Sequence, residues 1–279
     1  MDLLLHTAWM QPTALTEPVQ PEPSRPEPIR CEPIQILAWN IESGGNDPEV
    51  IALQLKQFGP VDVFALSEVS PRSINKYAEA LGPDYQSVVS RTGGADRLQI
   101  LFRSDRFRLV RSMEMDTLND GNHRSPLLVH LRDKASGLDF QVVGNHLSRG
   151  NAELRESQAS GLREWARQQT MATVAIGDFN FDYSFVTEQG NSGFAAMLRD
   201  NVWQWVKPVE WVDTNWSDGR FGRGGDGLDD YPDSMLDFAF VAGPARDWNP
   251  RCEVIKRPGD FPDDETTSDH RPTELILTP

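Results

Sequence analysis

The chain has 279 residues, and 38% of them are hydrophobic, which is enough to fill the core of one large domain. This composition excludes collagen-like proteins, coiled coils and wholly disordered chains. Acidic residues outnumber basic ones 42 to 27 and the formal net charge is −15, so the sequence offers no basic face for the phosphate backbone of a nucleic acid.

Residues 1–33 differ in composition from the rest of the chain. Glu-Pro recurs every five residues from Glu17 to Pro33, and proline fixes φ and removes an amide donor. We therefore expect a solvated tail, either a tether or a dispensable leader, ahead of one domain at 34–279. No apolar stretch reaches the roughly 20 residues that cross a bilayer, so we expect no transmembrane segment. We expect a cytoplasmic protein as written, or a secreted one if the start site is truncated.

Short apolar runs alternate with helical stretches in the first part of the domain. The pattern predicts a buried strand at 34–41, a helix at 48–58, a strand at 61–66 and a helix at 71–81. Successive strands joined by polar turns then form a meander, which favours antiparallel pairing. These strands are predicted at 85–90, 98–102, 107–113, 127–131 and 140–143.

The second half of the domain is richer in turns. A helix is predicted at 152–169, followed by a strand at 172–176 that ends in Gly177-Asp178. Further strands are expected at 202–206, 235–241, 253–256 and 273–277. About a dozen strands with several helices and no internal linker predict one α/β domain of two packed sheets with outer helices.

Polar residues occur in six places where an apolar strand stops or starts. They are Asn40, Glu68, Asn145 with His146, Asp178 with Asn180, Asp237, and Ser268-Asp269-His270. A single such residue is usually a turn or cap residue, but six together indicate a site. Their oxygens are hard ligands that suit Mg²⁺ first and Mn²⁺ second, and the two histidines can transfer protons near neutral pH. Two acidic loops, at 226–233 and 260–265, are candidates for an additional Ca²⁺.

These motifs together resemble the endonuclease/exonuclease/phosphatase superfamily of deoxyribonuclease-like, metal-dependent phosphoesterases, and its uncharacterised bacterial branch in particular. The resemblance covers residues 34–279 and rests on the order Trp39-Asn40-Ile41, Ser67-Glu68, Asn145-His146-Leu147, Gly177-Asp178-Phe179-Asn180, Leu236-Asp237-Phe238 and Ser268-Asp269-His270. It implies a four-layer α/β sandwich with two central, mostly antiparallel sheets flanked by helices.

The resemblance also implies a role for each strand-end residue. Asn40 and Glu68 would hold a divalent cation, with Asp269 on the same or a second ion. Asp178 would orient or deprotonate the attacking water, and Asn180 would position the water or the phosphate. His270, oriented by Asp237, would act as acid or base, and His146 would stand across the scissile phosphate.

Two more residues, Arg124 and Asp96, match the superfamily more loosely. Arg124 resembles its phosphate-contacting arginine, and Asn145 and Arg149 are candidates for contact with the substrate. Asp96 occupies the place where deoxyribonuclease-like members have a carboxylate behind the first histidine.

The sequence therefore predicts a Mg²⁺-dependent phosphodiesterase, expected to be monomeric, with nucleic acid as a candidate substrate. A phosphatase or a lipid phosphodiesterase on the same scaffold is the alternative. A non-catalytic binding module and a carbohydrate-active protein are more remote alternatives. Cys31 and Cys252 are interpreted as two separate thiols rather than one long-range disulfide.

Overall fold

The structure is a computed structural model that describes residues 31–119, 124–217, 229, 234–260 and 266–279. The predicted tail up to residue 30 lies outside the described residues, as do most of the two acidic loops considered for Ca²⁺. In the described residues, no helix is long and apolar enough to cross a membrane. Cys31 and Cys252 carry free thiols.

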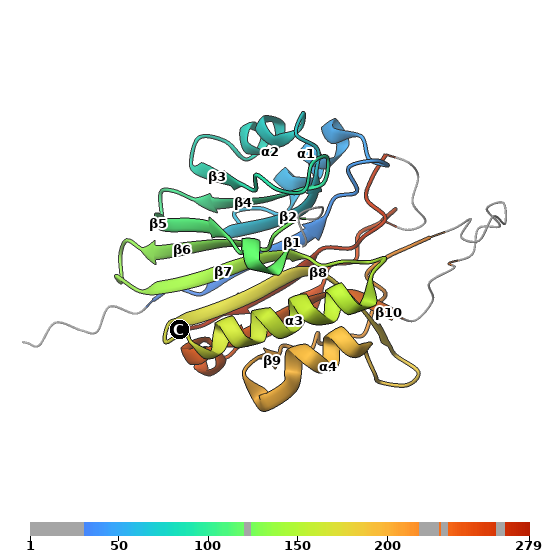
Figure 1. Ribbon diagram of the computed structural model, residues 1–279. Coiled ribbons are helices and arrows are strands. Elements are labelled where there is room, and N and C mark those ends of the chain that lie inside the picture. The colour runs from blue at the N-terminus through green and yellow to red at the C-terminus, as the bar shows by residue number, and fades with distance from the viewer. Residues whose placement is uncertain (1–30, 120–123, 218–228, 230–233, 261–265) are drawn as a thin grey trace, which may run out of the picture.

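Two six-stranded sheets form the centre of the described structure (Figure 1). The first sheet has the order β11-β12-β1-β2-β4-β3, with the strands Arg251–Val254, Thr273–Leu277, Ile34–Asn40, Val63–Val69, Arg97–Arg103 and Tyr85–Val89. The second has the order β5-β6-β7-β8-β10-β9, with the strands Phe107–Glu114, Leu127–Asp133, Asp139–His146, Ala172–Ser184, Ser234–Ala242 and Gln204–Trp205.

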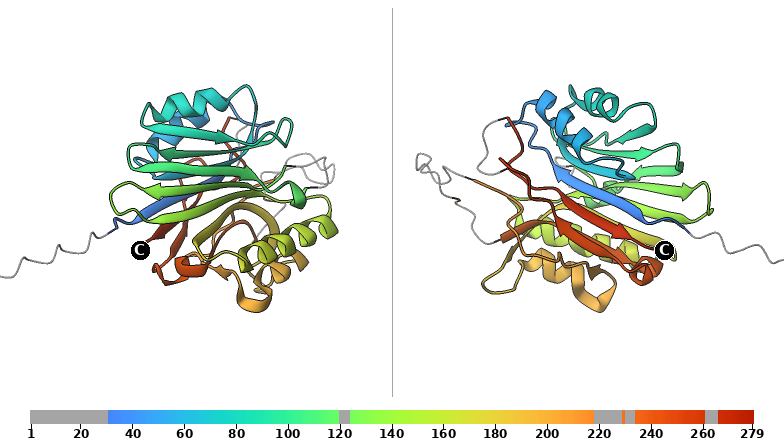
Figure 2. Two further views of the ribbon diagram at one scale, coloured as in Figure 1. Left: turned by 60° about the vertical axis from the view of Figure 1, so that its left-hand side comes forward. Right: turned by 180° about the vertical axis from the view of Figure 1, so that it is seen from behind.

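Helices cover the outer face of each sheet, which gives four layers (Figure 2). α1 (Pro48–Gln57) and α2 (Ile74–Leu81) pack on the first sheet, and α3 (Ala152–Arg167) and α4 (Ser192–Leu198) on the second. α1 begins where the sequence predicts, because the Asp47 side chain accepts a hydrogen bond from Glu49 N (2.8 Å) and proline occupies the first turn.

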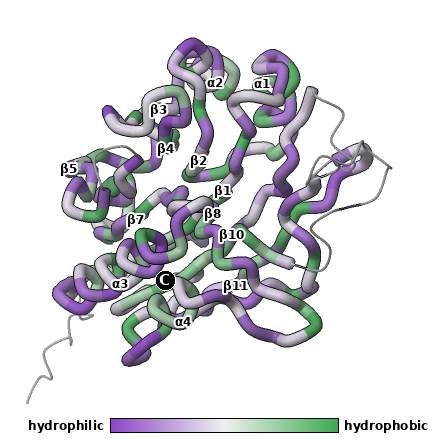
Figure 3. The backbone as a smooth tube through the Cα atoms, turned by 45° about the vertical axis from the view of Figure 1, so that its right-hand side comes forward, coloured by the Kyte–Doolittle hydropathy of each residue, from purple (hydrophilic) through white to green (hydrophobic). Residues whose placement is uncertain are grey.

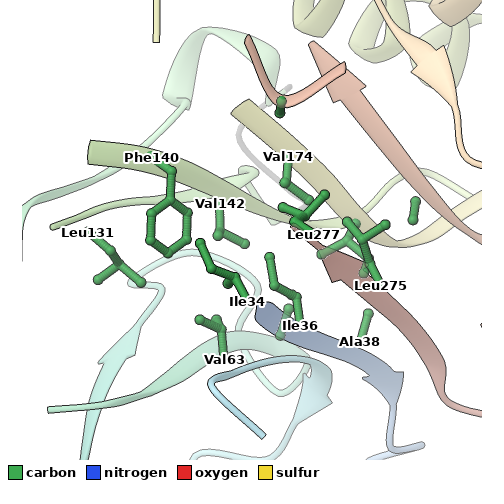
Figure 4. Packing of buried hydrophobic residues seen from close by; sticks show 14 of the residues in the cluster. Ile34, Ile36, Ala38, Val63, Leu131, Phe140, Val142, Val174, Leu275 and Leu277 are labelled. Atoms are coloured by element: carbon green, nitrogen blue, oxygen red, sulfur yellow. The ribbon is translucent and has the colours of Figure 1, made fainter. Parts of the chain in front are cut away.

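The main hydrophobic core lies between the two sheets. Figure 4 shows side chains of β1 and β12 facing those of β7 and β8, among them Ile36, Leu275, Val142 and Val174. The central strands are buried on both faces, which explains why they are almost continuously apolar. Along β10, for example, hydrophobic residues predominate (Figure 3).

Strand pairing brings distant segments to one edge of the sandwich. β1 and β2 run parallel with Asn40 beside Ser67, and β7 and β8 run parallel with His146 beside Asp178. Because the Asn40 amide also contacts Asp178, the ends of β1, β2 and β7 meet the middle of β8 at the same edge. The C-terminus lies at the opposite edge, because β12 runs antiparallel to β1 (Figure 1).

The strand predicted at 172–176 does not end at Gly177 but continues as β8 to Ser184. Local preference for a turn at Gly, Asp and Asn is worth at most about 1 kcal/mol. Burying the alternate side chains Phe179, Phe181 and Tyr183 stabilises the strand by roughly 1.5–3 kcal/mol each, and β10 pairs alongside as far as Ser184. The strand predicted at 140–143 likewise extends to His146.

Other boundaries also differ from the prediction. The strand expected at 202–206 is reduced to β9, that expected at 253–256 is shifted to β11, and α2 begins three residues later than expected. α4, with seven residues, is too short to give a periodic signal and was not predicted. The meander is antiparallel within each sheet, but β4 and β5 belong to different sheets, so their connection is a crossing and not a hairpin.

Candidate active site

The carboxylate of Asp178 is buried at the edge of the sandwich where β1, β2 and β7 end. The amide nitrogen of Asn40 donates to Asp178 Oδ2 (3.1 Å) and to Glu68 Oε1 (3.0 Å). The second oxygen, Asp178 Oδ1, accepts a hydrogen bond from the backbone N–H of Asn180 (2.9 Å). One amide group thus holds two carboxylates side by side, although their residues are 110 positions apart in the chain.

Two histidines lie close to the Asp178 carboxylate, one from the second sheet and one from the segment before a strand of the first sheet. His146, at the end of β7, has Nε2 at 3.4 Å from Asp178 Oδ2 and 3.7 Å from Glu68 Oε1. His270, on the segment that leads into β12, has Nε2 at 3.9 Å from the same Asp178 oxygen. Both imidazoles are buried, so the structure brings together the two proton-transferring groups that the sequence predicts.

His270 is held by Asp237 through the other ring nitrogen. Nδ1 of His270 lies 2.8 Å from Asp237 Oδ2, and both side chains are almost completely buried. This contact fixes the ring so that Nε2 faces the Asn40 amide (3.5 Å) and the Asp178 carboxylate (3.9 Å). Asp269 Oδ1 lies 3.9 Å from His270 Nε2, so three carboxylates surround one imidazole.

The backbone is strained at two site residues that lie within strands β2 and β8. Glu68 has a φ of +55°, next to a bulge in the pairing of β2 with β4, and Asn180 has a φ of +52°. Such bulges re-aim a side chain, and here the Glu68 carboxylate reaches Asn40. Gly177 has a φ of +131°, and a Cβ there would lie 2.3 Å from the backbone oxygen of Asn145, so this position requires glycine.

The pKa values of both central groups are raised above their ordinary values. Burial, with the nearby Asp237 charge, raises the pKa of Asp178 to about 7. Burial by itself would lower the pKa of His270, but the carboxylates of Asp237, Asp269 and Asp178 raise it to about 10. Between these values the pair consists of an aspartate anion and an imidazolium cation.

The raised pKa of Asp178 predicts a gain in stability when its charge is removed. A carboxyl group whose pKa is raised by folding stabilises the native state at pH values below its pKa in the unfolded chain. For Asp178 that pKa is near 3.8, and the contribution is lost as the pH rises through the folded-state pKa of about 7. In EDTA, Asp178→Asn is therefore expected to raise the Tm relative to the wild type by about 2 °C or more at pH 8, with a smaller difference at pH 5. Thermal unfolding at both pH values measures this, and a difference that shrinks as the pH rises would contradict it.

Arg124 stands beside these groups and is mostly buried. Its Nε donates to the backbone oxygen of His146 (3.2 Å), and its Nη1 lies 3.5 Å from Asp96 Oδ2. Burial lowers the pKa of Arg124, while the charges of Glu68, Asp178 and Asp96 act in the opposite direction. The described contacts of the Asp96 carboxylate are with Arg124 and with the Ser43 hydroxyl, whereas the sequence leads us to expect it behind the histidine.

Asn145 and Arg149 are the predicted residues that the described contacts do not join to the central cluster. The Asn145 amide donates to the backbone oxygen of Val143 (2.8 Å) within its own strand, and Arg149 is exposed on the loop after β7. Asn180 is close to the centre through its backbone, and its side-chain nitrogen donates to the backbone oxygen of Leu147.

Side chains hold the backbone of four successive residues, from the last residue of β7 into the loop that follows it. These hydrogen bonds are Arg124 Nε to His146 O, Asn180 Nδ2 to Leu147 O (3.1 Å), Ser148 N to Gln158 Oε1 (2.9 Å), and Arg155 Nη1 to Ser148 O (2.9 Å) and Arg149 O (2.8 Å). α3 therefore supplies, through Arg155 and Gln158, the support that keeps the histidine end of β7 in place.

Two supporting residues could not be assigned from the sequence. Thr214 is fully buried, and its hydroxyl oxygen accepts hydrogen bonds from the backbone N–H groups of Leu236 (2.8 Å) and Asp237 (3.2 Å). Glu42 accepts a hydrogen bond from the backbone N–H of Asp269 (3.1 Å). Both act on backbone groups far away in the chain, and no local pattern signals such contacts.

The donor chemistry of the site fits a hard divalent cation. In the described part of the chain, no group of three or more His, Cys, Asp and Glu side chains is close enough to hold a metal ion. Mg²⁺ does not need one, because it is usually held by one or two carboxylates together with water. The Glu68 side chain is about 25% exposed, and the buried Asn180 Oδ1 has no hydrogen-bond partner among the described residues. Asn40 turns its oxygen to the backbone N–H of Glu42.

Residues 37–270 match the model of the Endonuclease/Exonuclease/phosphatase family. The chain belongs to this family. The resemblance found in the sequence motifs is thereby confirmed. Members of the family are phosphoesterase hydrolases that generally depend on a divalent metal ion.

Solved structures of the family share the fold. An endonuclease/exonuclease/phosphatase from Bacteroides vulgatus has a TM-score of 0.66 at 16% identity, covering 88% of this chain and 99% of that chain. A mannosyl-6-phosphatase from Bacteroides thetaiotaomicron has a TM-score of 0.61 at 17% identity, with the same coverage. D. rerio TDP2 complexed with single strand DNA product has a TM-score of 0.67 at 13% identity, covering 89% and 100%.

These likenesses confirm the predicted α/β sandwich and, at such low identity, bear on the fold alone. No curated protein matches the chain in sequence.

Proposed function

We propose that the chain is a metal-dependent phosphodiesterase in which Asp178 orients and deprotonates the attacking water. The observation that carries this proposal is the contact of one buried carboxylate with the Asn40 amide and with two imidazoles at 3.4 and 3.9 Å. We assign the activity to residues 34–279, with His146, Asn180, Asp237 and His270 as its other catalytic groups.

Asp178 suits the part of a base near neutral pH. A general base is most effective when its pKa is close to the working pH, and burial raises the pKa of Asp178 to about 7. The hydrogen bonds from Asn40 and Asn180 fix the orientation of the carboxylate. A water bound to it would be held for in-line attack on phosphorus, which lowers the entropic part of the barrier.

His270 suits the part of a cation and proton donor. With a pKa of about 10 it stays protonated at neutral pH, and Asp237 holds the ring in one orientation. Its Nε2–H can stabilise negative charge that develops on the phosphoryl group or donate its proton to the leaving oxygen. His146 also lies beside Asp178, and we propose that it stands across the scissile phosphate from His270 and contacts a different phosphate oxygen.

Glu68 and Asp269 are the residues that we propose hold the divalent cation. A bound Mg²⁺ or Mn²⁺ would reduce the charge that a phosphodiester presents to an incoming nucleophile. Asn40 directs N–H toward the carboxylates and not its oxygen, so we assign it to holding Glu68 and Asp178 in place. Arg124 would contact the phosphate, and exposed Arg149 a more distant part of the substrate.

The substrate class follows from charge. With a formal net charge of −15, the chain is better suited to a small phosphodiester or a lipid head group than to a long polyanion. Cleavage of DNA and RNA is assayed beside these substrates. Phosphomonoester hydrolysis is the second candidate, which the shared fold with a mannosyl-6-phosphatase favours.

Metal removal tests the proposal directly. We expect the protein to hydrolyse bis(p-nitrophenyl) phosphate in Mg²⁺, to lose at least about 99% of this activity in excess EDTA, and to regain it when Mg²⁺ or Mn²⁺ is restored. Plasmid DNA, RNA, an inositol phosphate, sphingomyelin and p-nitrophenyl phosphate, assayed in parallel, identify the substrate class. Hydrolysis that is unaffected by EDTA, or no hydrolysis of any phosphoester, would refute the proposal.

A further inference from the structure

Asp96 places a negative charge beside Arg124. Among the described contacts, Arg124 is the arginine that interacts with the central carboxylates. Its Oδ2 lies 3.5 Å from Arg124 Nη1, and the same guanidinium interacts electrostatically with Glu68 and Asp178. The Asp96 side chain is 41% exposed and that of Arg124 13%. Asp96 is therefore the more solvent-accessible partner of this pair.

The Asp96 carboxylate is fixed in this position. Its Oδ1 accepts a hydrogen bond from the Ser43 hydroxyl (2.7 Å), and its backbone N–H donates to Gly93 O (2.8 Å), which closes a tight turn. Gly93 has a φ of +96°, and a Cβ there would lie 3.1 Å from Arg124 Cβ and 2.5 Å from the backbone oxygen of Asp96. The turn is thus packed directly on Arg124, and the hydrogen bond from Ser43 holds the Asp96 carboxylate beside the guanidinium.

Phosphodiesters and phosphomonoesters differ in the negative charge that they would bring next to Asp96. A phosphodiester carries one negative charge and a phosphomonoester close to two at neutral pH. Repulsion by a fixed carboxylate grows in proportion to the charge of the ligand, and it acts over the Debye length of roughly 8–10 Å at moderate salt. A phosphate bound to Arg124 lies within that distance of Asp96, since both contact the same guanidinium.

We propose that Asp96 is a specificity-determining residue that favours monoanionic phosphodiesters over dianionic phosphomonoesters. This inference rests on the proposed function, because it assumes that Arg124 contacts the substrate phosphate. Asp96 acts through its charge next to Arg124 and takes no part in the chemical step.

The test compares kcat/KM for bis(p-nitrophenyl) phosphate and p-nitrophenyl phosphate in Mg²⁺. In Asp96→Asn, the ratio of monoester to diester kcat/KM is expected to rise about five- to tenfold, a discounted value for a partly exposed charge. Asp96→Ser, which also removes the charge, should give the same change, and Asp96→Glu, which keeps it, should stay within about twofold of the wild type. The increase should shrink in about 0.5 M salt.

Asp105→Asn is the matched control. Asp105 is 43% exposed and pairs with an arginine, Arg103, at the opposite end of β4 from Asp96, so its loss removes the same charge away from the site. We expect no change in its ratio. If the ratio of monoester to diester kcat/KM in Asp96→Asn and Asp96→Ser equals that of Asp105→Asn and the wild type, with diester hydrolysis intact, this inference is overturned and the proposed function stands. Absence of phosphoester hydrolysis by the wild type would instead overturn the proposed function.

Discussion

Replacing Asp178 by asparagine is expected to lower kcat for phosphodiester hydrolysis by at least about a hundredfold, the scale of losing a positioned general base. Asparagine keeps the shape of the side chain and removes its basicity, but its single carbonyl oxygen can accept only one of the two hydrogen bonds that the Asp178 carboxylate accepts, from Asn40 and from the Asn180 N–H. Steady-state kinetics at pH 8 measures it, with the wild type at the same Mg²⁺ concentration as the reference.

Misfolding cannot account for that result if stability moves as expected. The same variant should be more stable than the wild type in EDTA at pH 8, because a buried carboxylate with a raised pKa has been removed. A fall in activity together with a rise in Tm would indicate that the Asp178 carboxylate is needed for catalysis and lowers the stability of the folded state. Turnover within about threefold of the wild type would remove Asp178 from the mechanism.

Replacing His270 by alanine is expected to reduce kcat by at least about a hundredfold, because the site loses the cation that stabilises developing charge and donates a proton. Asp237→Asn should have a smaller effect, about tenfold, since the imidazole remains but its orientation and protonation are less well supported. Both rates are measured with the bis-aryl phosphodiester in Mg²⁺.

The chain offers a matched control for this pair. His130 Nε2 lies 2.9 Å from Asp139 Oδ1, so the second sheet carries another His–Asp contact, where β6 pairs with the start of β7 and not with the end that carries His146. His130→Ala and Asp139→Asn should leave kcat within about twofold of the wild type. If these controls lose as much activity as His270→Ala and Asp237→Asn, the effect is structural and the assignment of His270 fails.

Much of the fold could be predicted because the signals are local. Asp47-Pro48 marks the start of α1, and the apolar run from Ile34 ends in Asn40, as β1 does. The predictions were wrong where burial overrode local preference: Gly177, Asp178 and Asn180 are typical of a turn, yet they lie inside β8 because the aromatic residues between and beyond them pack under α3 and α4.

The site shows the same division. Its residue types can be read from the sequence, because each follows or begins an apolar run. Their partners cannot: the sequence leads us to expect Asp96 behind a histidine, and the structure has it on Arg124 and Ser43. Thr214 gives no signal, although it supports Asp237. These contacts depend on loop paths that no periodicity encodes.

The sequence by itself determined the family, the two-sheet sandwich and the set of polar residues at the strand ends, because apolar periodicity and short motifs are properties of neighbouring residues. The tertiary structure decided which of those residues meet: parallel pairing of β1 with β2 and of β7 with β8 carries Asn40, Glu68, His146 and Asp178 to one edge. It also decided how the site side chains are oriented, which depends on burial and on contacts between distant residues, such as the hydrogen bond from Asn40 to Asp178, more than a hundred positions away.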